Sequence, residues 1–285
     1  MMLYAPSEHI CLQNKKELKV LFEHIDNARD LGGIPAAGGR EIRPHRLIRT
    51  AHLHDASDAD VMRLKEEYKL CRIFDFRSMN EFKVVPDREI EGVQHHLLPT
   101  IDMRAEQQTG KPIPDEAFFE LDRHIVNYSF YPEVQVMARN MYPSLIQSEF
   151  SQLQYAAFLR LIVEAPEDGG ILWHCAQGKD RTGWGAAFLM FALGVERQTV
   201  IDDFELSNEA YRPIVEKLNR DIDERGGGEA EKAVIQAFMG VSTPNFISTL
   251  DLIDREYGGM TNYLHDILCL THEDMQTLRK RYLVG

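Results

Sequence analysis

A cysteine and an arginine stand six residues apart in one polar segment of the chain, with a glycine between them. An apolar run, Gly170 to Trp173, precedes the segment, and a helix-like run, Trp184 to Leu193, follows it. This order predicts a strand, a tight loop and a helix. The segment itself reads His174-Cys175-Ala176-Gln177-Gly178-Lys179-Asp180-Arg181-Thr182-Gly183.

The predicted loop has the chemistry of an anion-binding site. Because it opens a helix, several of its backbone N–H groups point toward one place. The Arg181 guanidinium adds a planar pair of donors that matches two phosphate oxygens. The same positive field favours the thiolate of Cys175 over the thiol, which makes the sulfur a nucleophile. The predicted phosphate-binding residues are Ala176, Gln177, Gly178, Lys179, Asp180 and Arg181.

The segment resembles the signature of the cysteine-dependent protein tyrosine phosphatases, in which His-Cys, five residues, Arg and then Ser or Thr recur. Its Gly-Lys-Asp-Arg-Thr-Gly ending is similar to the atypical bacterial and fungal members of the tyrosine and lipid, or "triple-specificity", type. Three other segments resemble motifs of that group, and the resemblance spans most of the chain. These segments are Asn27 to Gly33, Asp75 to Glu81, and Asp203 to Asn208.

Strand-like and helix-like segments alternate along the chain. This alternation predicts an α/β fold with a mostly parallel central sheet flanked by helices, as the resemblance to tyrosine phosphatases also implies. We expect a single phosphatase domain over 1–285, with an almost wholly helical region after Thr199. The predicted strands are 47–50, 70–76, 93–98 and 170–173, and the predicted helices before the loop are 57–68 and 151–164.

Residues 100–150 fit no core strand and are rich in proline and aromatic residues. Two interpretations stay open. One is a helical lid over the site, as the resemblance to the atypical phosphatases implies. The other is a peripheral insertion packed on the domain.

The chemistry that these residues support is a two-step phosphoryl transfer. The Cys175 thiolate attacks phosphorus in line, and water hydrolyses the resulting phosphocysteine. Arg181 and the loop amides hold the equatorial oxygens, so the site requires neither a metal nor a cofactor. We expect His174 to steady the Cys175 backbone, with a packing role as its alternative. The Thr182 hydroxyl can donate to the sulfur or cap the following helix.

Two aspartates compete to protonate the leaving group. Asp180 lies inside the loop, beside the reacting phosphoryl group, and we favour it. Asp75 ends a neighbouring strand, and its alternative is a structural carboxylate paired with Arg29 or Arg77. Weaker candidates lie on the side of residues 100–150; they are Asp102 and Asp115.

Lys179 bears on the class of substrate. A second cation beside the reacting phosphate favours substrates with more than one phosphate, and in the phosphoinositide phosphatases a lysine at this loop position has that role. The alternative is a solvated lysine that balances Asp180. The resemblance further implies that Arg29 and Asp30 brace the loop, and the alternative for them is an exposed turn pair.

Composition limits the partners. The chain has 285 residues and a formal net charge of −13, which argues against broad binding to nucleic acid or to an anionic membrane. No apolar run approaches the ~20 residues needed to span a bilayer, and the first residues do not resemble a secretory signal. We expect a cytoplasmic protein with reduced cysteines, and export by another route stays open.

The leading hypothesis is a metal-independent phosphatase acting on phosphotyrosine, with phosphoserine, phosphothreonine and phosphoinositides as further options. Its partners would be phosphorylated proteins or phosphoinositides, with phosphate as a product. An inactive phosphate-binding module ranks lower, because the nucleophile, the arginine and the acid are all present. A sulfur transferase of the rhodanese type ranks lower because its cysteine loop would not end in this way. Pairs of histidines at 52 and 54 and at 95 and 96 are weak as metal ligands.

Overall fold

The computed structural model of the protein describes residues 22–102 and 132–285. Asp115, one of the weaker acid candidates, and most of the 100–150 segment lie outside these ranges. Within the described ranges, no helix is both long enough and apolar enough to cross a membrane.

A five-stranded sheet forms the centre of the molecule, in the order β1-β3-β6-β4-β5. Strands β3, β6, β4 and β5 run parallel, and the edge strand β1 is antiparallel to β3. The bounds are β1 (Arg29–Asp30), β3 (Leu47–Thr50), β6 (Gly170–His174), β4 (Leu70–Asp75) and β5 (Gln94–Leu97). A second small sheet joins β2 (Glu41–Ile42) to β7 (Leu283–Val284). The predicted mostly parallel sheet is confirmed.

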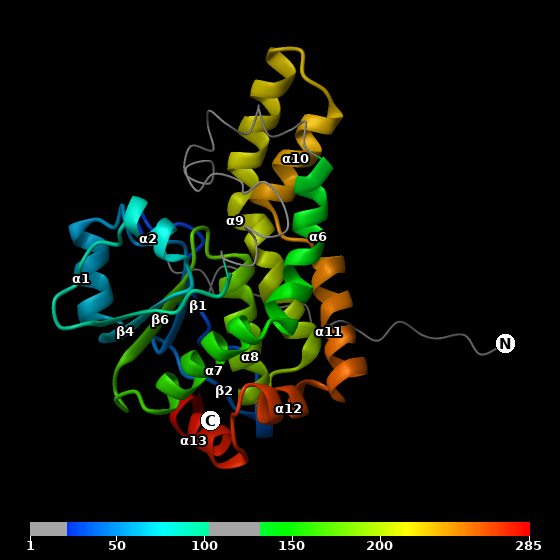
Figure 1. The fold of residues 1–285 in the computed structure, drawn as a ribbon. Helices are drawn as coiled ribbons and strands as arrows, with labels where there is room; N and C mark the ends of the chain where they lie inside the picture. Colours follow the sequence, from blue (N-terminus) through cyan, green and yellow to red (C-terminus); the bar gives the residue numbers. More distant parts are fainter. Residues whose placement is uncertain (1–21, 103–131) are drawn as a thin grey trace.

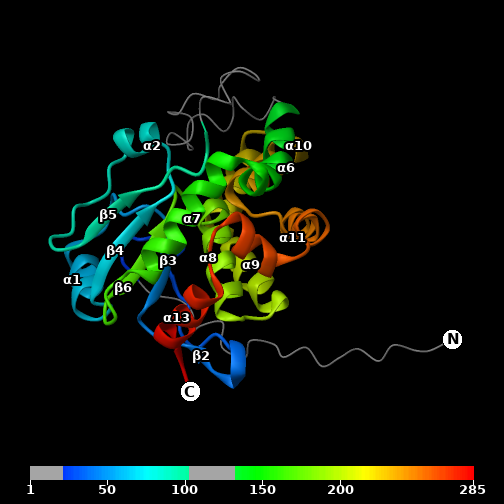
Figure 2. The same cartoon turned by 60° about the horizontal axis from the view of Figure 1, so that its bottom comes forward.

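Alternating side chains of the strands pack against two different helical layers. Ile48, Ile73 and Leu172 face α1 (Asp58–Glu66), and they share a buried cluster with its Leu64. Their sequence neighbours point the opposite way, because successive strand residues alternate between faces. These neighbours join the larger core with α7 (Glu149–Val163), α8 (Asp180–Leu193) and α13 (His272–Tyr282). Figure 2 shows α1 on one face of the sheet and α7 and α8 on the other.

Four helices stand together beside the sheet, at the right of Figure 1. They are α6 (Pro132–Gln147), α9 (Arg197–Glu224), α10 (Glu229–Met239) and α11 (Thr243–Tyr257). Gly226 to Gly228 separate α9 from α10, and α11 begins at the pair Thr243-Pro244. The predicted helical region after Thr199 is confirmed. The remaining short elements are η1 (Ala37–Gly39), α2 (Met79–Val84), α12 (Met260–Asn262) and η2 (Tyr263–Ile267).

The described part of the 100–150 segment contributes to the core. Tyr142, Leu145 and Ile146 of α6 are buried in the same cluster as α8 and α11. This part of α6 therefore belongs to the core of the domain. Both interpretations of residues 100–150 stay predictions, because most of that segment lies outside the described ranges.

The register of the sheet brings the ends of three strands level. Thr50 of β3 pairs with His174 of β6, which also pairs with Asp75 of β4. Ligands in such sheets bind outside the carboxyl ends of the strands. The segments that follow these three strands therefore meet at one edge of the sheet, and the loop between β6 and α8 is one of them.

Candidate active site

The loop between β6 and α8 follows the prediction from sequence. Cys175 comes directly after β6, and α8 begins at Asp180. Gly178 has a φ of +64°, and a Cβ added there would lie 2.2 Å from the carbonyl oxygen of Thr50. Only glycine therefore lets the loop turn so close to the end of β3.

Side chains from distant segments hold the carbonyl groups of the loop from outside. Asn27 donates to the carbonyls of Gln177 (3.1 Å) and Gly178 (3.0 Å). Arg49 donates to those of Gly178 (3.0 Å) and Lys179 (3.2 Å). In a trans peptide the N–H points opposite to the C=O, so these bonds turn the following N–H groups toward the inside of the loop. The loop is thereby fixed as a cradle for an anion.

A buried ion cluster fixes these donors in turn. The Asp203 carboxylate pairs with Arg49 and, at 3.1 Å, with Arg29. Ser207 accepts from Arg29 (3.2 Å) and from Asn27 (3.4 Å). Burial by itself would raise the pKa of Asp203, but the two guanidinium groups outweigh it and lower that pKa. The ionised carboxylate thus holds both arginines under the loop.

Arg29 and Asp30, in the segment Asn27 to Gly33, contact different parts of the molecule. Arg29 reaches the loop indirectly, through Asn27 and Asp203. Asp30 instead accepts the N–H groups of Gly32 (2.9 Å) and His45 (2.7 Å). The structure does not place Asp30 on the loop, so the expectation that it hydrogen-bonds there is wrong. The alternative of an exposed pair is also wrong, because both side chains are buried.

Arg181 is clamped by a glutamate from α2. Its two terminal nitrogens each lie 2.7 Å from an oxygen of Glu81. The Glu81 carboxylate also accepts the N–H of Ser78 (2.7 Å), while the Ser78 hydroxyl accepts the N–H of Glu81, which is a capping box. Burial opposes charge on both partners, but the pair keeps the pKa of Glu81 low and raises that of Arg181. Arg181 still has further N–H donors for phosphate oxygens.

Asp180 lies at the first position of α8 and is held by two groups. The hydroxyl of Tyr142 donates to one oxygen at 2.7 Å. The ammonium of Lys179 lies 3.6 Å from the other oxygen. Tyr142 also accepts the N–H of Ser242 at 3.3 Å, so its direction is set from both sides.

Lys179 is neither solvated nor free to bind a second phosphate in this arrangement. Its ammonium donates to the carbonyl of Phe238 and, at 2.9 Å, to that of Gly240, besides its contact with Asp180. The two carbonyls take two of its three N–H donors, and the contact with Asp180 at 3.6 Å is an ion pair. Burial lowers the pKa of Lys179. The expectation of a solvated lysine is therefore wrong, although its pairing with Asp180 is observed.

Asp75 is buried behind the loop. The guanidinium of Arg77 meets its carboxylate at 2.7 Å, and the Arg77 backbone N–H donates to it at 2.9 Å. This geometry matches the structural alternative, with Arg77 rather than Arg29 as the partner. Asp102, a weaker candidate, is the last residue of the first described range.

The Thr182 hydroxyl oxygen is buried and has no hydrogen-bond partner within the described ranges. The cap position of α8 belongs to Lys179, which makes no side-chain cap bond. The capping alternative for Thr182 is therefore wrong. The hydroxyl makes no hydrogen bond to the Cys175 sulfur in this structure, so its role toward the sulfur stays a prediction.

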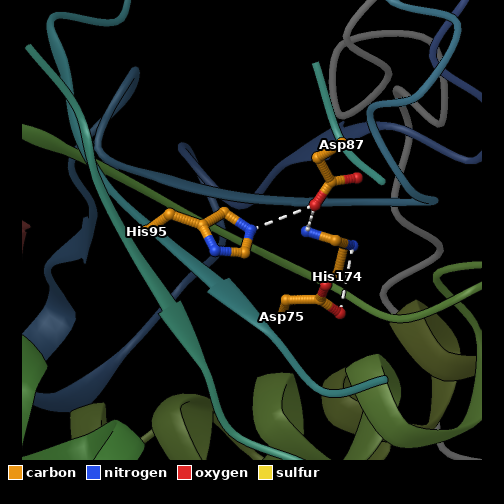
Figure 3. A group of neighbouring side chains, drawn as sticks. All are labelled: Asp75, Asp87, His95 and His174. Carbon is orange, nitrogen blue, oxygen red and sulfur yellow. Dashed lines mark hydrogen bonds and ion pairs between the residues drawn. The ribbon is translucent and has the colours of Figure 1, made fainter. Parts of the chain in front are cut away.

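His174 lies fully buried between the loop and a cluster of charged residues (Figure 3). Its Nδ1 is 3.2 Å from the carbonyl oxygen of Cys175. Its Nε2 is 3.0 Å from the carboxylate of Asp87, a residue for which the sequence analysis had no role.

One group of side chains has the composition of a metal site. Ligand atoms of Asp75, Asp87, His95 and His174 lie within 4.8 Å of one another. The guanidinium of Arg77, however, already pairs with both carboxylates, at 2.7 and 2.9 Å. A cation placed between them would face that positive charge, so the four residues fit a compensated charge network better than a metal centre.

The fold and the loop together define the class of cysteine-dependent phosphatases. The family model described as the tyrosine phosphatase family matches residues 20–284. The chain belongs to the tyrosine phosphatase family, and the resemblance expected from its motifs is confirmed.

Two named proteins and one solved structure are similar to this chain. A protein of Cupriavidus necator named as a tyrosine-protein phosphatase is 28% identical over 264 residues, which cover 93% of this chain and 88% of that protein. The triple specificity protein phosphatase PtpB of Mycobacterium tuberculosis is 25% identical over 257 residues, covering 84% of this chain and 90% of that protein. The crystal structure of P. aeruginosa TpbA is 14% identical with a TM-score of 0.31, and it covers 74% of this chain and 89% of that one.

Sequence reasoning missed several supporting residues. Asn27, Glu81 and Asp203 stood in the motifs that carried the resemblance, but spacing alone gave them no partner. Arg49 could have been noticed as a charged residue inside an apolar strand. Tyr142 and Asp87 carried no signal, because nothing local marks a contact across 38 or 87 residues of chain.

The clamp on Arg181 leads to a first prediction. The Glu81→Gln variant keeps the shape but removes the charge that orients the guanidinium. We expect kcat/KM for p-nitrophenyl phosphate to fall by about 10- to 100-fold, the equivalent of one charge-assisted hydrogen bond. Steady-state kinetics of the purified variant measure this. The matched control is Glu66→Gln at an exposed site of α1; equal activity of both variants would contradict the clamp.

Proposed function

We propose that this chain acts as one phosphatase domain that hydrolyses phosphotyrosine through a phosphocysteine intermediate, with phosphoserine and phosphothreonine as further substrates. The observation that carries the proposal is the preorganised cradle around Cys175. Its carbonyls are held outward by Asn27 and Arg49, and its arginine is held by Glu81. Donors fixed before the substrate arrives stabilise transition-state charge without reorganisation.

The reaction follows from the positions of the groups. The Cys175 thiolate attacks phosphorus, a P–S bond forms, and the bond from phosphorus to the ester oxygen breaks. Arg181 and the loop N–H groups hold the three equatorial oxygens during the transfer. The departing oxygen takes a proton from Asp180. Water then attacks the phosphocysteine, gives its proton back to Asp180, and releases phosphate and the thiolate, to which Thr182 donates.

Asp180 is the acid that the geometry supports best. It lies in the loop, and Tyr142 and Lys179 hold its carboxylate without burying it completely. Asp75 meets Arg77 on the far side of the strand end and is fully buried. We assign Asp75 a structural role.

A direct test of the function uses the nucleophile. Wild-type protein should hydrolyse p-nitrophenyl phosphate and a phosphotyrosine peptide in the presence of a chelator, and Cys175→Ser should lose at least ~10³-fold in rate while still binding vanadate. Absorbance at 405 nm and phosphate release measure turnover. Wild-type protein that binds vanadate without hydrolysis would support the inactive module instead, and sulfur transfer to cyanide would support the rhodanese-type alternative.

The acid assignment has its own test. Asp180→Asn should lower kcat/KM for phenyl phosphate by about 10²-fold or more, and less for p-nitrophenyl phosphate, because only the poor leaving group needs the proton. Asp75→Asn should lose the same factor on both substrates. It should also unfold more easily, by about 1.5–3 kcal/mol, because Arg77 loses one of its two carboxylate partners. A leaving-group dependence found in Asp75→Asn and not in Asp180→Asn would reverse the assignment.

Phosphoinositide hydrolysis was the alternative that rested on Lys179. Since the ammonium is engaged by Phe238, Gly240 and Asp180, we expect Lys179→Met to lower turnover of a phosphotyrosine peptide and of a phosphatidylinositol phosphate by the same factor. Parallel phosphate-release assays measure the ratio of the two turnover rates. The control is Lys217→Met at an exposed site of α9. Selective loss on the lipid would restore the second-phosphate role of Lys179.

Location and partners are proposals of the same kind. We propose a cytoplasmic protein whose partners are phosphorylated proteins. Three cysteines of the described ranges, Cys71, Cys175 and Cys269, are free thiols, which agrees with a reducing compartment.

A further inference from the structure

The ring of His174 faces an oxygen at each of its two nitrogens. Nδ1 lies 3.2 Å from the Cys175 carbonyl oxygen, and Nε2 lies 3.0 Å from the Asp87 carboxylate (Figure 3). A carbonyl and a carboxylate only accept hydrogen bonds. The contact of Nδ1 has hydrogen-bond geometry, whereas the contact of Nε2 with Asp87 is a short ion-pair distance without it. A neutral ring would leave the Asp87 carboxylate beside an uncharged nitrogen, and a doubly protonated ring gives the pair its opposite charges.

The surroundings compensate the resulting charge. The ring is fully buried, and burial disfavours an imidazolium. Asp87 at 3.0 Å and Asp75 at 3.8 Å outweigh that effect and raise the pKa of His174 above its ordinary value. The other groups that face this cluster are Arg77 from the end of β4, His95 from β5, His52 from the segment after β3, and Cys175 itself.

Asp87 is the central residue of this network. One of its oxygens accepts the backbone N–H of Leu53 at 2.8 Å. The other contacts Arg77 (2.9 Å), His95 (3.1 Å) and His174. Burial would raise the pKa of Asp87, but the contact with His174, the hydrogen bond with His95 and the charge of Arg77 hold that pKa well below the usual range. Its single carboxylate therefore links residues of β5 and β6 to residues that follow β3 and β4.

We propose that Asp87 is a positioning residue for the nucleophile, acting by holding His174 as an imidazolium behind Cys175. The Nδ1–H of that imidazolium fixes the Cys175 carbonyl at the start of the loop, and its positive charge lies one residue from the sulfur. Both effects favour the thiolate that the proposed phosphatase reaction uses, so the inference rests on that function. It assigns the work to a residue outside the loop and outside every motif of the sequence.

The variant Asp87→Asn tests this in the full-length protein, because it keeps the size of the side chain and removes its charge. Histidine ring nitrogens are followed by ¹⁵N NMR against pH, with the His174 signal assigned from its loss in His174→Gln. The rate of Cys175 alkylation by iodoacetamide is measured over the same pH range. The matched control is His272→Gln, which removes an exposed histidine at the start of α13, outside this network.

We expect wild-type His174 to carry both protons at pH 7. In Asp87→Asn the ring should lose its charge at lower pH, and alkylation at pH 6 should slow by about tenfold, the effect of one unit on the pH axis. The kcat/KM for p-nitrophenyl phosphate at pH 6 should fall by a similar factor, while His272→Gln should stay within about twofold of wild type on every measure.

Folding stability adds a second signature. Because the pKa of His174 is raised in the folded state, its charged pair stabilises the fold fully below the ordinary value of ~6.5 and loses that contribution as pH rises through the raised value. Urea unfolding of wild type should show this loss, and Asp87→Asn should show less of it.

Two results would overturn the proposal. One is a neutral His174 ring in wild-type protein at pH 7. This measurement does not depend on the folding of any variant. The other is an Asp87→Asn protein with unchanged ring titration and alkylation. Both are measured without turnover, so a wild-type protein that hydrolyses no phosphate ester would contradict the proposed function and not this inference.

Discussion

The direction of a few backbone carbonyl groups is the constraint on which this site depends. A loop of six or so residues can bind phosphate only if its N–H groups point inward, and peptide geometry allows that only if its carbonyls point outward. Asn27, Arg49 and Tyr211 supply the donors that hold those carbonyls. Without these external partners the same residues would have no reason to keep a conformation that concentrates partial positive charge. The proposed nucleophile, Cys175, therefore depends on the side chains that hold the loop from outside.

The acidic composition of the chain is compatible with a loop that binds an anion. Its net charge is −13. Four cations that the described ranges place at the loop each have a carboxylate as a close partner. Arg181 pairs with Glu81, Lys179 with Asp180, and the two arginines beneath the loop share Asp203. Buried charges need such partners because their desolvation is costly. What remains for a phosphate is the unpaired edge of Arg181 and the inward N–H groups, so orientation rather than a surplus of charge makes the site.

The supporting residues come from nearly the whole described chain. Asn27 lies near its start, Glu81 opens α2, Tyr142 belongs to α6, and Tyr211 to α9. They meet because the parallel strands end at one edge of the sheet and the helical bundle packs beside that edge (Figure 1). The fold thus positions a small catalytic group by using long-range contacts that also stabilise the domain. Changes in α6 or α9 are expected to reach the loop through Tyr142 and Tyr211.

Local features of the sequence determined the class of fold and the course of the loop from Cys175 to Arg181, because strand, turn and helix preferences and the Cys–Arg spacing all act over short distances. The roles of Cys175 as nucleophile and of the loop residues in phosphate binding stay proposals. Spacing left open whether Asp75 or Asp180 is the acid, and what Lys179 binds, since both depend on partners far along the chain. Only the tertiary structure placed Asp75 on Arg77, Lys179 on the carbonyls after α10, and Asp87 behind His174. Burial and ion pairing are properties of the assembled core, and no local pattern encodes them.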